Sequence, residues 1–325
     1  MSETLPHSAS APADRPHLRF DELVARAQQG PAVLTAVVHP CDLASLEGAL
    51  EAARLKLIVP ILVGPVQKIQ QTAARYGLDI AGLDVVDAAH SHDAARKAVE
   101  QVRAGRAEAL MKGSLHTDEL MSAVVARETG LRTERRVSHC FIMDVPGHPQ
   151  PLVITDAAIN IAPSLKDKVD IVQNAIDLAH ALGAAEVRVA ILSAMETVNP
   201  DVPSTIEAAA LCKMADRGQI TGAMLDGPLA LDNAISPEAA AIKKIDSPVA
   251  GRANVLVVPD LEAGNMLAKS LSFLAGADAA GVVLGARVPI ILTSRADAEI
   301  TRLASCAVAS LLAAARRSTL SAAIH

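Results

Sequence analysis

From about Ala32 onward, short runs rich in β-branched residues alternate with longer stretches of helical periodicity. The first of these predict a strand over residues 33–38, a helix over 41–54 and a second strand over 57–63. Alternation of this kind is typical of βαβ units, in which a helix links two parallel strands. We therefore expect an α/β fold with a mainly parallel sheet.

One pair of predicted strands departs from this pattern. Residues 136–145 and 152–155 read as strands joined by a Pro-Gly-His-Pro turn at 146–149, which predicts an antiparallel hairpin. The chain has 325 residues, about twice the ~150 residues of a typical domain. The hairpin is therefore expected to open a second lobe.

Composition excludes several classes of partner. With no Trp, one Tyr and three Phe, the chain lacks the aromatic side chains on which single-stranded nucleic acids stack. A net charge of −6 and a pI of about 5.9 do not supply the basic face that duplex binding needs. We expect no nucleic-acid partner. Any anionic ligand must be held locally, by a few Arg or Lys side chains and by helix N-termini.

The apolar segments and the cysteines indicate a cytoplasmic protein. The first twenty residues lack the basic and apolar regions of a secretory signal and read as a polar tail. The longest apolar runs, at 282–292 and 303–315, are interrupted or shorter than the ~20 residues of a spanning helix, so we expect no membrane insertion. The four cysteines form no CxxC pair and read as buried free thiols of a reducing compartment.

Several catalytic motifs are absent from the sequence, namely GxGxxG, GxxxxGK[ST], HExxH and GxSxG. P-loop hydrolysis, zincin chemistry and α/β-hydrolase chemistry therefore lose support. The run His90-Ser91-His92-Asp93 could imitate a metal-binding pair, but it stands where a helix should begin. We interpret it as a capped helix start, and we expect no metal site.

Five segments place small, acidic or hydroxyl residues where a predicted strand gives way to a helix. Open α/β sheets bind their ligands at such positions, so we expect the five segments to share a crevice. They contribute the candidate substrate-binding residues Lys112, Gly113, Asp156, Asn160, Asp226, Glu262 and Asn265, together with the segment 293–297.

The segment 293–297 carries the clearest chemistry. Ser294 and Arg295 stand at a predicted strand-to-helix turn, where backbone N–H groups and the helix dipole favour an anion. The guanidinium of Arg295 adds a fork of donors that matches phosphate oxygens, so the two residues predict a phosphate cradle. Asp297 is near enough to act as a base, although the residues alone favour the N-cap of the last helix.

Five blocks of the sequence lie in a fixed order between about residues 30 and 315. In that order they resemble the phosphate acetyltransferase and phosphate butyryltransferase family, and so many ordered blocks make the resemblance highly specific. The blocks are MKGSLHTDEL (111–120), ITDAAINIAPSLKDKVDIVQNAIDLAHALG (154–183), PSTIEAAALCKMADRGQITGAMLDGPLALDNAIS (203–236), VPDLEAGNMLAKSL (258–271) and VPIILTSRAD (288–297).

The resemblance implies a two-lobed fold similar to that of the isocitrate and isopropylmalate dehydrogenases, with mainly parallel sheets and an interlobe cleft. The end of the chain would return to complete the first lobe. Residues 1–138 with 286–325 would then form the first lobe, and 139–285 the second, through which the family commonly forms homodimers. The implied reaction moves a short acyl group between coenzyme A and inorganic phosphate, with both as substrates and with no cofactor.

The resemblance also implies roles for particular residues. The family's Ser-Arg pair matches Ser294 and Arg295, which implies that Arg295 binds the phosphate or phosphoryl group and that Ser294 hydrogen-bonds the reacting carbonyl region. The family's catalytic acid matches Asp297 or Glu299, and we favour Asp297.

Two further arginines of the family are harder to match. One that precedes the lobe boundary matches Arg136, although Arg132 and Arg135 stand in the same stretch. Another is expected on the helix after the Glu-Ala-Gly-Asn block and falls near Phe273, where this sequence departs from the family pattern.

The resemblance leaves two routes for the acyl group. Phosphate can attack the thioester directly in a ternary complex, or the acyl group can pass through an enzyme nucleophile. No cysteine stands in a recognisable activating setting, so we favour the ternary complex. Ser294 and Arg295 would stabilise the developing charge, and in the reverse direction Asp297 would take the thiol proton of CoA.

Three alternatives stay open beside phosphate acetyltransferase activity. The blocks LTSRAD and MADRGQITG lean towards the butyryl branch, so the acyl group could be butyryl or another short chain. A metal- and NAD(P)-dependent decarboxylating dehydrogenase would need a cluster of aspartates around Mg²⁺ or Mn²⁺, and no matching spacing is visible. A non-catalytic CoA- or metabolite-binding protein would keep the lobes without turnover, and the set Ser294-Arg295-Asp297 argues against it.

Overall fold

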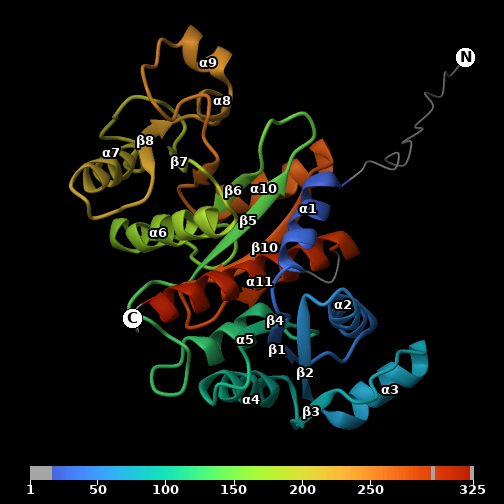
Figure 1. Cartoon of the computed structure of the whole chain (residues 1–325). Coiled ribbons are helices and arrows are strands. Elements are labelled where there is room, and N and C mark those ends of the chain that lie inside the picture. Colours follow the sequence, from blue (N-terminus) through green and yellow to red (C-terminus); the bar gives the residue numbers. More distant parts are fainter. Residues whose placement is uncertain (1–16, 294–296, 323–325) are drawn as a thin grey trace, which may run out of the picture.

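The computed structural model describes residues 17–293 and 297–322 of the chain. Within this part, eleven strands form one sheet in the order β3-β2-β1-β4-β11-β10-β5-β6-β9-β7-β8, and helices cover both of its faces (Figure 1). The strands are β1 (Val33–Val38), β2 (Ile58–Gly64), β3 (Asp84–Asp87), β4 (Ala109–Lys112), β5 (Ser138–Asp144), β6 (Leu152–Thr155), β7 (Arg188–Leu192), β8 (Met224–Leu229), β9 (Val255–Val257), β10 (Asp278–Leu284) and β11 (Ile290–Ile291). The helices are α1 (Leu18–Ala27), α2 (Leu43–Arg54), α3 (Val66–Tyr76), α4 (Ser91–Arg103), α5 (Thr117–Val124), α6 (Leu165–Ala181), α7 (Pro203–Asp216), α8 (Leu231–Ile235), α9 (Pro237–Ile242), α10 (Leu261–Ala275) and α11 (Glu299–Ala322).

The sheet is mainly parallel, as expected, and its strands reverse direction around β10. Strands β1, β2, β3, β4 and β11 pair in parallel, and so do β6, β9, β7 and β8. Between these sets β10 is antiparallel to both β11 and β5, and the expected hairpin of β5 with β6 is confirmed. The two parallel sets therefore run in opposite directions, and their carboxyl ends point to opposite edges of the sheet.

This reversal corrects the expectation that five strand ends share one crevice. The segments after β4 and β11 leave the sheet at one edge, whereas those after β6 and β9 leave towards the other. Lys112 and Thr155 end strands that are separated by β11, β10 and β5, a distance of about 19 Å at ~4.8 Å per strand spacing. A short hydrophobic run reads the same in either strand direction, so the sequence pattern carries no sign of the reversal.

The core consists mostly of aliphatic side chains on both faces of the sheet. Successive side chains of a strand point to opposite faces of the sheet, and β10 is an example. Val282 belongs to the cluster that contains residues of α2, α6 and α11, whereas Val283 belongs to the cluster under α4 and α5. A third cluster lies under α8, α9 and α10. The sheet is therefore covered on both faces along its length.

The end of the chain returns to the first part of the sheet, as expected. Strand β11 pairs with β4, and α11 packs against α1, α2 and β10 (Figure 1). A single sheet passes through both predicted lobes, with β10 and β5 at the place where they join. The boundaries at 138/139 and 285/286 themselves stay a prediction.

Helix α1 corrects the interpretation of the first twenty residues as a polar tail, since the helix already begins at Leu18. Polar contacts join this helix and its N-cap residue to the predicted second lobe. Arg19 donates to Asp144 at 2.6 Å, His17 Nδ1 lies 2.5 Å from an oxygen of Asp278, and Arg26 donates to the carbonyl of Leu182 at 2.7 Å. Helix α1 also packs on α11, so it links the two parts of the molecule.

No helix in residues 17–293 and 297–322 combines the length and the apolar character that crossing a membrane requires. The expected capped start of α4 is confirmed, because the ring of His90 accepts a hydrogen bond from the backbone N–H of Asp93. The run at residues 90–93 therefore begins a helix, and its histidine satisfies one of the N–H groups that a helix start leaves open.

Candidate active site

The first lobe has a point where the order of its strands reverses. The chain runs from β1 outward to β2 and β3, and then returns to place β4 on the other side of β1. The carboxyl ends of β1, β4 and β11 consequently meet at one edge of the sheet. Open α/β sheets bind ligands at such a switch point, because the connections leave in opposite directions and open a crevice.

The chain is packed tightly where β1 and β4 end. The backbone N–H of Gly113 donates to the carbonyl of Val38 at 2.9 Å, and that of Ser114 donates to the carbonyl of His39 at 2.9 Å. A Cβ on Gly113 would lie 2.7 Å from the same carbonyl oxygen of His39, so glycine is required there by close backbone approach. Gly113 thus shapes the crevice through its backbone.

His39 was missed by sequence reasoning. It adopts φ +56, in the left-handed region that is uncommon for a non-glycine residue and often marks a functional turn. The hydroxyl of Ser114 donates to the His39 carbonyl at 2.7 Å and lies 3.0 Å from Nδ1 of the ring. Burial is the main cause that lowers the pKa of His39, and the positive charge of Lys68 lowers it further.

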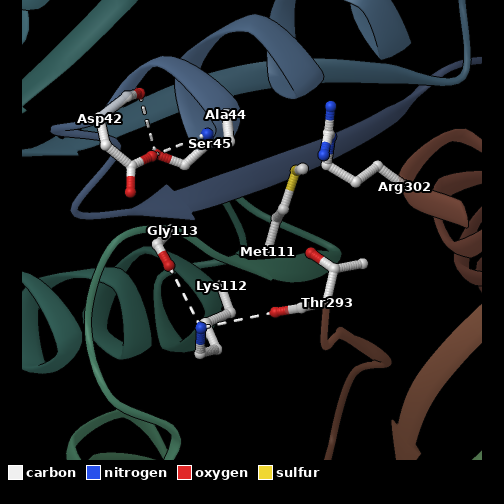
Figure 2. A pocket seen from close by; sticks show the side chains of 8 residues that line it. All are labelled: Asp42, Ala44, Ser45, Met111, Lys112, Gly113, Thr293 and Arg302. Carbon is white, nitrogen blue, oxygen red and sulfur yellow. Dashed lines mark hydrogen bonds between the residues drawn. The ribbon is translucent and has the colours of Figure 1, made fainter. Parts of the chain in front are cut away.

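A small pocket opens at this edge of the sheet, between the start of α2, the end of β4 and Thr293, two residues after β11 (Figure 2). The side chain of Lys112 is buried, and its Nζ lies 3.3 Å from the carbonyl oxygen of Gly113 and 3.5 Å from that of Thr293. Arg302 of α11 lines the same pocket beyond Met111. Lys112 and Arg302 therefore both border the pocket at the switch point.

The first turn of α2 forms the other wall of the pocket. Asp42 caps this helix, and its carboxylate accepts hydrogen bonds from the backbone N–H of Ser45 at 2.9 Å and from its hydroxyl at 2.6 Å. The carboxylate is thereby occupied within its own helix start. Asp42, Ser45 and Arg302 were missed by sequence reasoning, because nothing in a single chain shows which residues of α2 and α11 border the end of β4.

Ser294 and Arg295, the expected phosphate cradle, lie outside the described residues. Thr293 and Asp297 are the described residues that lie before and after residues 294–296. Thr293 lines the pocket, and the carbonyl of Asp297 accepts a hydrogen bond from Arg302 at 2.6 Å. Helix α11 begins at Glu299, two residues after Asp297, so the expectation that Asp297 is its N-cap is wrong. The backbone N–H of Arg302 donates instead to the carbonyl of Ala298, the residue before Glu299.

A second group of expected site residues gathers after β6. The carboxylate of Asp156 is buried and accepts hydrogen bonds from the backbone N–H groups of Ala158, Ile159 and Asn160 at 3.0 to 3.1 Å. Burial raises the pKa of Asp156, and these hydrogen bonds oppose the rise. The amide of Asn160 accepts from Nε of Arg136 at 2.7 Å. This group is largely satisfied by its own members.

The structure does not bring this second group to Lys112. Arg136 precedes β5 by two residues. The pairing of β11 with β10 and of β10 with β5 sets Thr293 level with Ile142. Along the strands, Arg136 is therefore about six residues, or ~20 Å, from the level of Thr293. The segment after β6 does reach towards the first lobe, because Ile159 packs against the same cluster as Leu292. A role of Arg136, Asp156 or Asn160 in substrate binding stays a prediction.

The remaining expected residues lie further away. Asp226 was expected after a strand end, but β8 continues to Leu229, so Asp226 lies inside the edge strand of the sheet. It is seven strand spacings, or about 34 Å, from β4, which removes it from the switch-point crevice. Glu262 is exposed in the first turn of α10, and Asn265 of the same helix donates to the carbonyl of Ala157 at 3.3 Å.

Comparison with known proteins identifies the family of this chain. The chain matches the model of the family described as phosphate acetyl/butaryl transferase over residues 88–310. It is 65% identical to a phosphate acetyltransferase of Rhizobium meliloti, over 94% of this chain and 97% of that protein. It is 42% identical to a phosphate butyryltransferase of Clostridium beijerinckii, over 91% of this chain and 98% of that protein.

The fold is likewise that of solved structures. A phosphotransacetylase from Streptococcus pyogenes matches with a TM-score of 0.79 at 22% identity, over 93% of this chain and 100% of that one. A 4-hydroxythreonine-4-phosphate dehydrogenase from Klebsiella pneumoniae matches with a TM-score of 0.52 at 13% identity, over 87% and 100% of the two chains. At these identities the likenesses concern the fold alone, and they confirm the expected dehydrogenase-like architecture. The chain belongs to the phosphate acetyltransferase and phosphate butyryltransferase family and is an acyltransferase.

Proposed function

We propose that this acyltransferase moves an acetyl group reversibly between acetyl-CoA and inorganic phosphate, giving acetyl phosphate and CoA. The observation that carries the choice of acetyl is the much higher identity to the acetyltransferase relative than to the butyryltransferase relative. The switch-point pocket supports the use of phosphate, because the positively charged side chain of Lys112 lines it. Butyryl-CoA is the second candidate substrate.

The reaction proceeds by direct attack within a ternary complex. An oxygen of hydrogen phosphate forms the new bond to the carbonyl carbon, the carbon–sulfur bond breaks, and the proton of the phosphate ends on the thiol of CoA. Holding both substrates at one edge of the sheet makes this attack effectively intramolecular. The enzyme then has to neutralise phosphate charge, stabilise the oxyanion and move one proton.

Four residues divide these tasks. Arg295 binds the phosphate and Ser294 hydrogen-bonds the reacting carbonyl. Lys112 adds a positive charge at the switch-point pocket, which the low exposure of its side chain keeps from being screened by solvent. In the reverse direction the carboxylate of Asp297 accepts the proton of the CoA thiol, since the thiolate is the nucleophilic form.

The four cysteines support direct attack over a covalent acyl-enzyme. Burial raises the pKa of Cys41 to about 11, and those of Cys140, Cys212 and Cys306 each to about 12. At neutral pH these thiols stay protonated, and a protonated thiol is a poor nucleophile. No described cysteine is therefore suited to carry the acetyl group.

Acetyl-CoA and phosphate act as substrates, and the reaction needs no further cofactor. We extend the proposal to a cytoplasmic homodimer formed through the second lobe. This lobe leaves large apolar side chains exposed, an arrangement that an interface would explain. A Phe273→Glu variant should shift the mass measured by light scattering from dimer to monomer. The exposed set includes Ile242 (74%), Met266 (63%), Phe273 (83%) and Leu274 (86%).

The decisive test is release of CoA thiol from acetyl-CoA and from butyryl-CoA, each with and without phosphate. Wild type is expected to release thiol only when phosphate is present, faster from acetyl-CoA, and Arg295→Ala should abolish the release. Faster release from butyryl-CoA would move the assignment to the second candidate. The absence of phosphate-dependent release from either thioester would overturn the acyltransferase mechanism in favour of a CoA-binding protein.

A further inference from the structure

Arg302 lies in the first turns of α11 and folds back over the start of its own helix. Its Nη1 donates to the main-chain carbonyl of Asp297 at 2.6 Å. Its backbone N–H donates to the carbonyl of Ala298 at 3.3 Å, which is the first hydrogen bond of the helix. Arg302 therefore ties both residues that precede the helix to the helix itself, Asp297 by its side chain and Ala298 by its main chain.

The guanidinium is held in place from the opposite side by α2. A Cβ added to Gly48 would lie 3.0 Å from both Cδ and Nε of Arg302, so the absence of a side chain at Gly48 makes room for the arginine. Nε itself is buried, and it has no hydrogen-bond partner within the part of the chain that the structure describes. Burying a donor without an acceptor is unfavourable, so a mere surface contact does not explain this placement.

We propose that Arg302 is a positioning residue for Asp297, held by the space at Gly48. The inference rests on the proposed role of Asp297 as acceptor of the CoA thiol proton. Proton transfer depends on the direction of the carboxylate, and a carboxylate is directed by the backbone that carries it. The Arg302 hydrogen bond fixes that backbone at residue 297, while α2 stops the guanidinium from turning away.

Because Arg302 lines the pocket, the main alternative to a positioning role is that its side chain binds phosphate directly. A residue that binds phosphate raises KM for phosphate or acetyl phosphate when it is removed, whereas a residue that positions the base lowers kcat. The two roles can therefore be separated by steady-state kinetics. A purely structural role would lower the melting temperature and leave both parameters unchanged.

The first measurement is CoA acetylation by acetyl phosphate in wild type, Arg302→Ala and Arg302→Lys. We expect Arg302→Ala to lower kcat about 10- to 100-fold with KM values within about threefold, because small misplacements of a catalytic group cost rates of this order. Arg302→Lys keeps one donor for the Asp297 carbonyl and should recover most of kcat. In Arg302→Ala the acidic limb of the kcat–pH profile should also shift. Arg317→Met, on the same helix and paired with Glu108 at 2.9 Å, is the matched control and should keep wild-type kcat.

The second measurement is a double-mutant cycle with Gly48→Ala. Alanine favours a helix over glycine, so a structural reading predicts equal or higher stability and unchanged turnover. Displacement of the Arg302 side chain should instead lower kcat in the wild-type background and have no further effect in Arg302→Ala. Additive effects, or a rise in KM for acetyl phosphate with unchanged kcat, would overturn the proposal. A wild type without phosphate-dependent activity would instead overturn the proposed function.

Discussion

Gly113 lies so close to Val38 that a Cβ on the glycine would be 2.3 Å from the Val38 carbonyl oxygen. This contact joins the ends of β1 and β4, the two strands that define the switch point. Gly113→Ala must separate these strands, so we expect a loss of about 3 kcal/mol of unfolding free energy, at the upper end of overpacking costs. Thermal melting and kcat/KM for acetyl-CoA should both fall.

The matched control for Gly113→Ala is Gly30→Ala. Gly30 has a single neighbouring atom in range, the Ala27 carbonyl oxygen at 3.8 Å from an added Cβ. Its substitution should leave activity unchanged and stability within about 1 kcal/mol. If Gly113→Ala behaves like this control, the two strand ends have more freedom than their spacing indicates.

Much of this fold can be predicted from the sequence because local signals mark its elements. Helix α6 occupies residues 165–181, and Ser164 and Asp167 form a capping box at its start. Helix α3 ends at Tyr76, because Gly77 takes φ +67 as its C-cap. Such signals depend on neighbours in the chain, so one sequence is enough to find them.

The errors arose where distant parts of the chain decide the outcome. The direction of β10 follows from its pairing with β5 and β11, and a hydrophobic run does not encode it. The same holds for the active site, since Arg302 reaches it from α11 and Asp42 from α2. Asp226 was misplaced because the Asp-Gly-Pro stretch reads as a turn, although β8 continues through it to Leu229.

Replacing Lys112 by methionine should weaken phosphate binding. The side chain is 8% exposed, and methionine keeps most of its volume while it removes the positive charge beside Gly113 and Thr293. A hydrogen bond to a charged group contributes about 1.5–3 kcal/mol, so we expect KM for phosphate to rise about 10- to 100-fold. Initial rates of acetyl phosphate formation over a range of phosphate concentrations measure this.

Lys213→Met is the control for Lys112→Met, because Lys213 pairs with Asp216 at 2.6 Å on the exposed surface of α7. Its KM for phosphate should match that of wild type. An unchanged KM in Lys112→Met as well would remove Lys112 from the phosphate site.

Asp297→Asn and Glu299→Gln together decide which carboxylate moves the proton. Asp297 is held by Arg302 beside the pocket, whereas Glu299 is exposed in the first turn of α11. General acid–base catalysis contributes about 10²- to 10⁴-fold, so Asp297→Asn should lose kcat by that factor and Glu299→Gln should not. The rate of CoA acetylation by acetyl phosphate, measured from about pH 5 to about pH 9, tests both variants. The reverse ranking would assign the role to Glu299.

Single alanine substitutions of the four cysteines should leave kcat within about twofold of wild type, because burial raises the pKa of each thiol far above neutral pH. Cys140→Ala and Cys306→Ala remove fully buried side chains, and they should lower the melting temperature without lowering turnover. A loss of about 100-fold or more in any one folded variant would instead favour an acyl-enzyme on that cysteine.

His139 should make the protein less stable in acid. Its ring is buried against Phe141 with ring centroids 4.4 Å apart, and burial lowers its pKa to about 3. In the unfolded chain the pKa returns to about 6.5. The unfolded state therefore binds one more proton between these values, and stability contributed by the neutral ring is present above pH ~6.5 and is lost as pH falls towards 3.

The slope of this loss is about 1.4 kcal/mol per pH unit for one proton. Urea unfolding at several pH values below about 6.5 should show that the free energy of unfolding declines less steeply in His139→Leu than in wild type. The reason is that leucine has no group that takes up a proton on unfolding. Phe141→Leu is the matched control, since it alters the same packing without a titrating group and should lower stability equally at every pH. Parallel curves for wild type and His139→Leu would mean that water reaches the ring and that its pKa is close to the unfolded value.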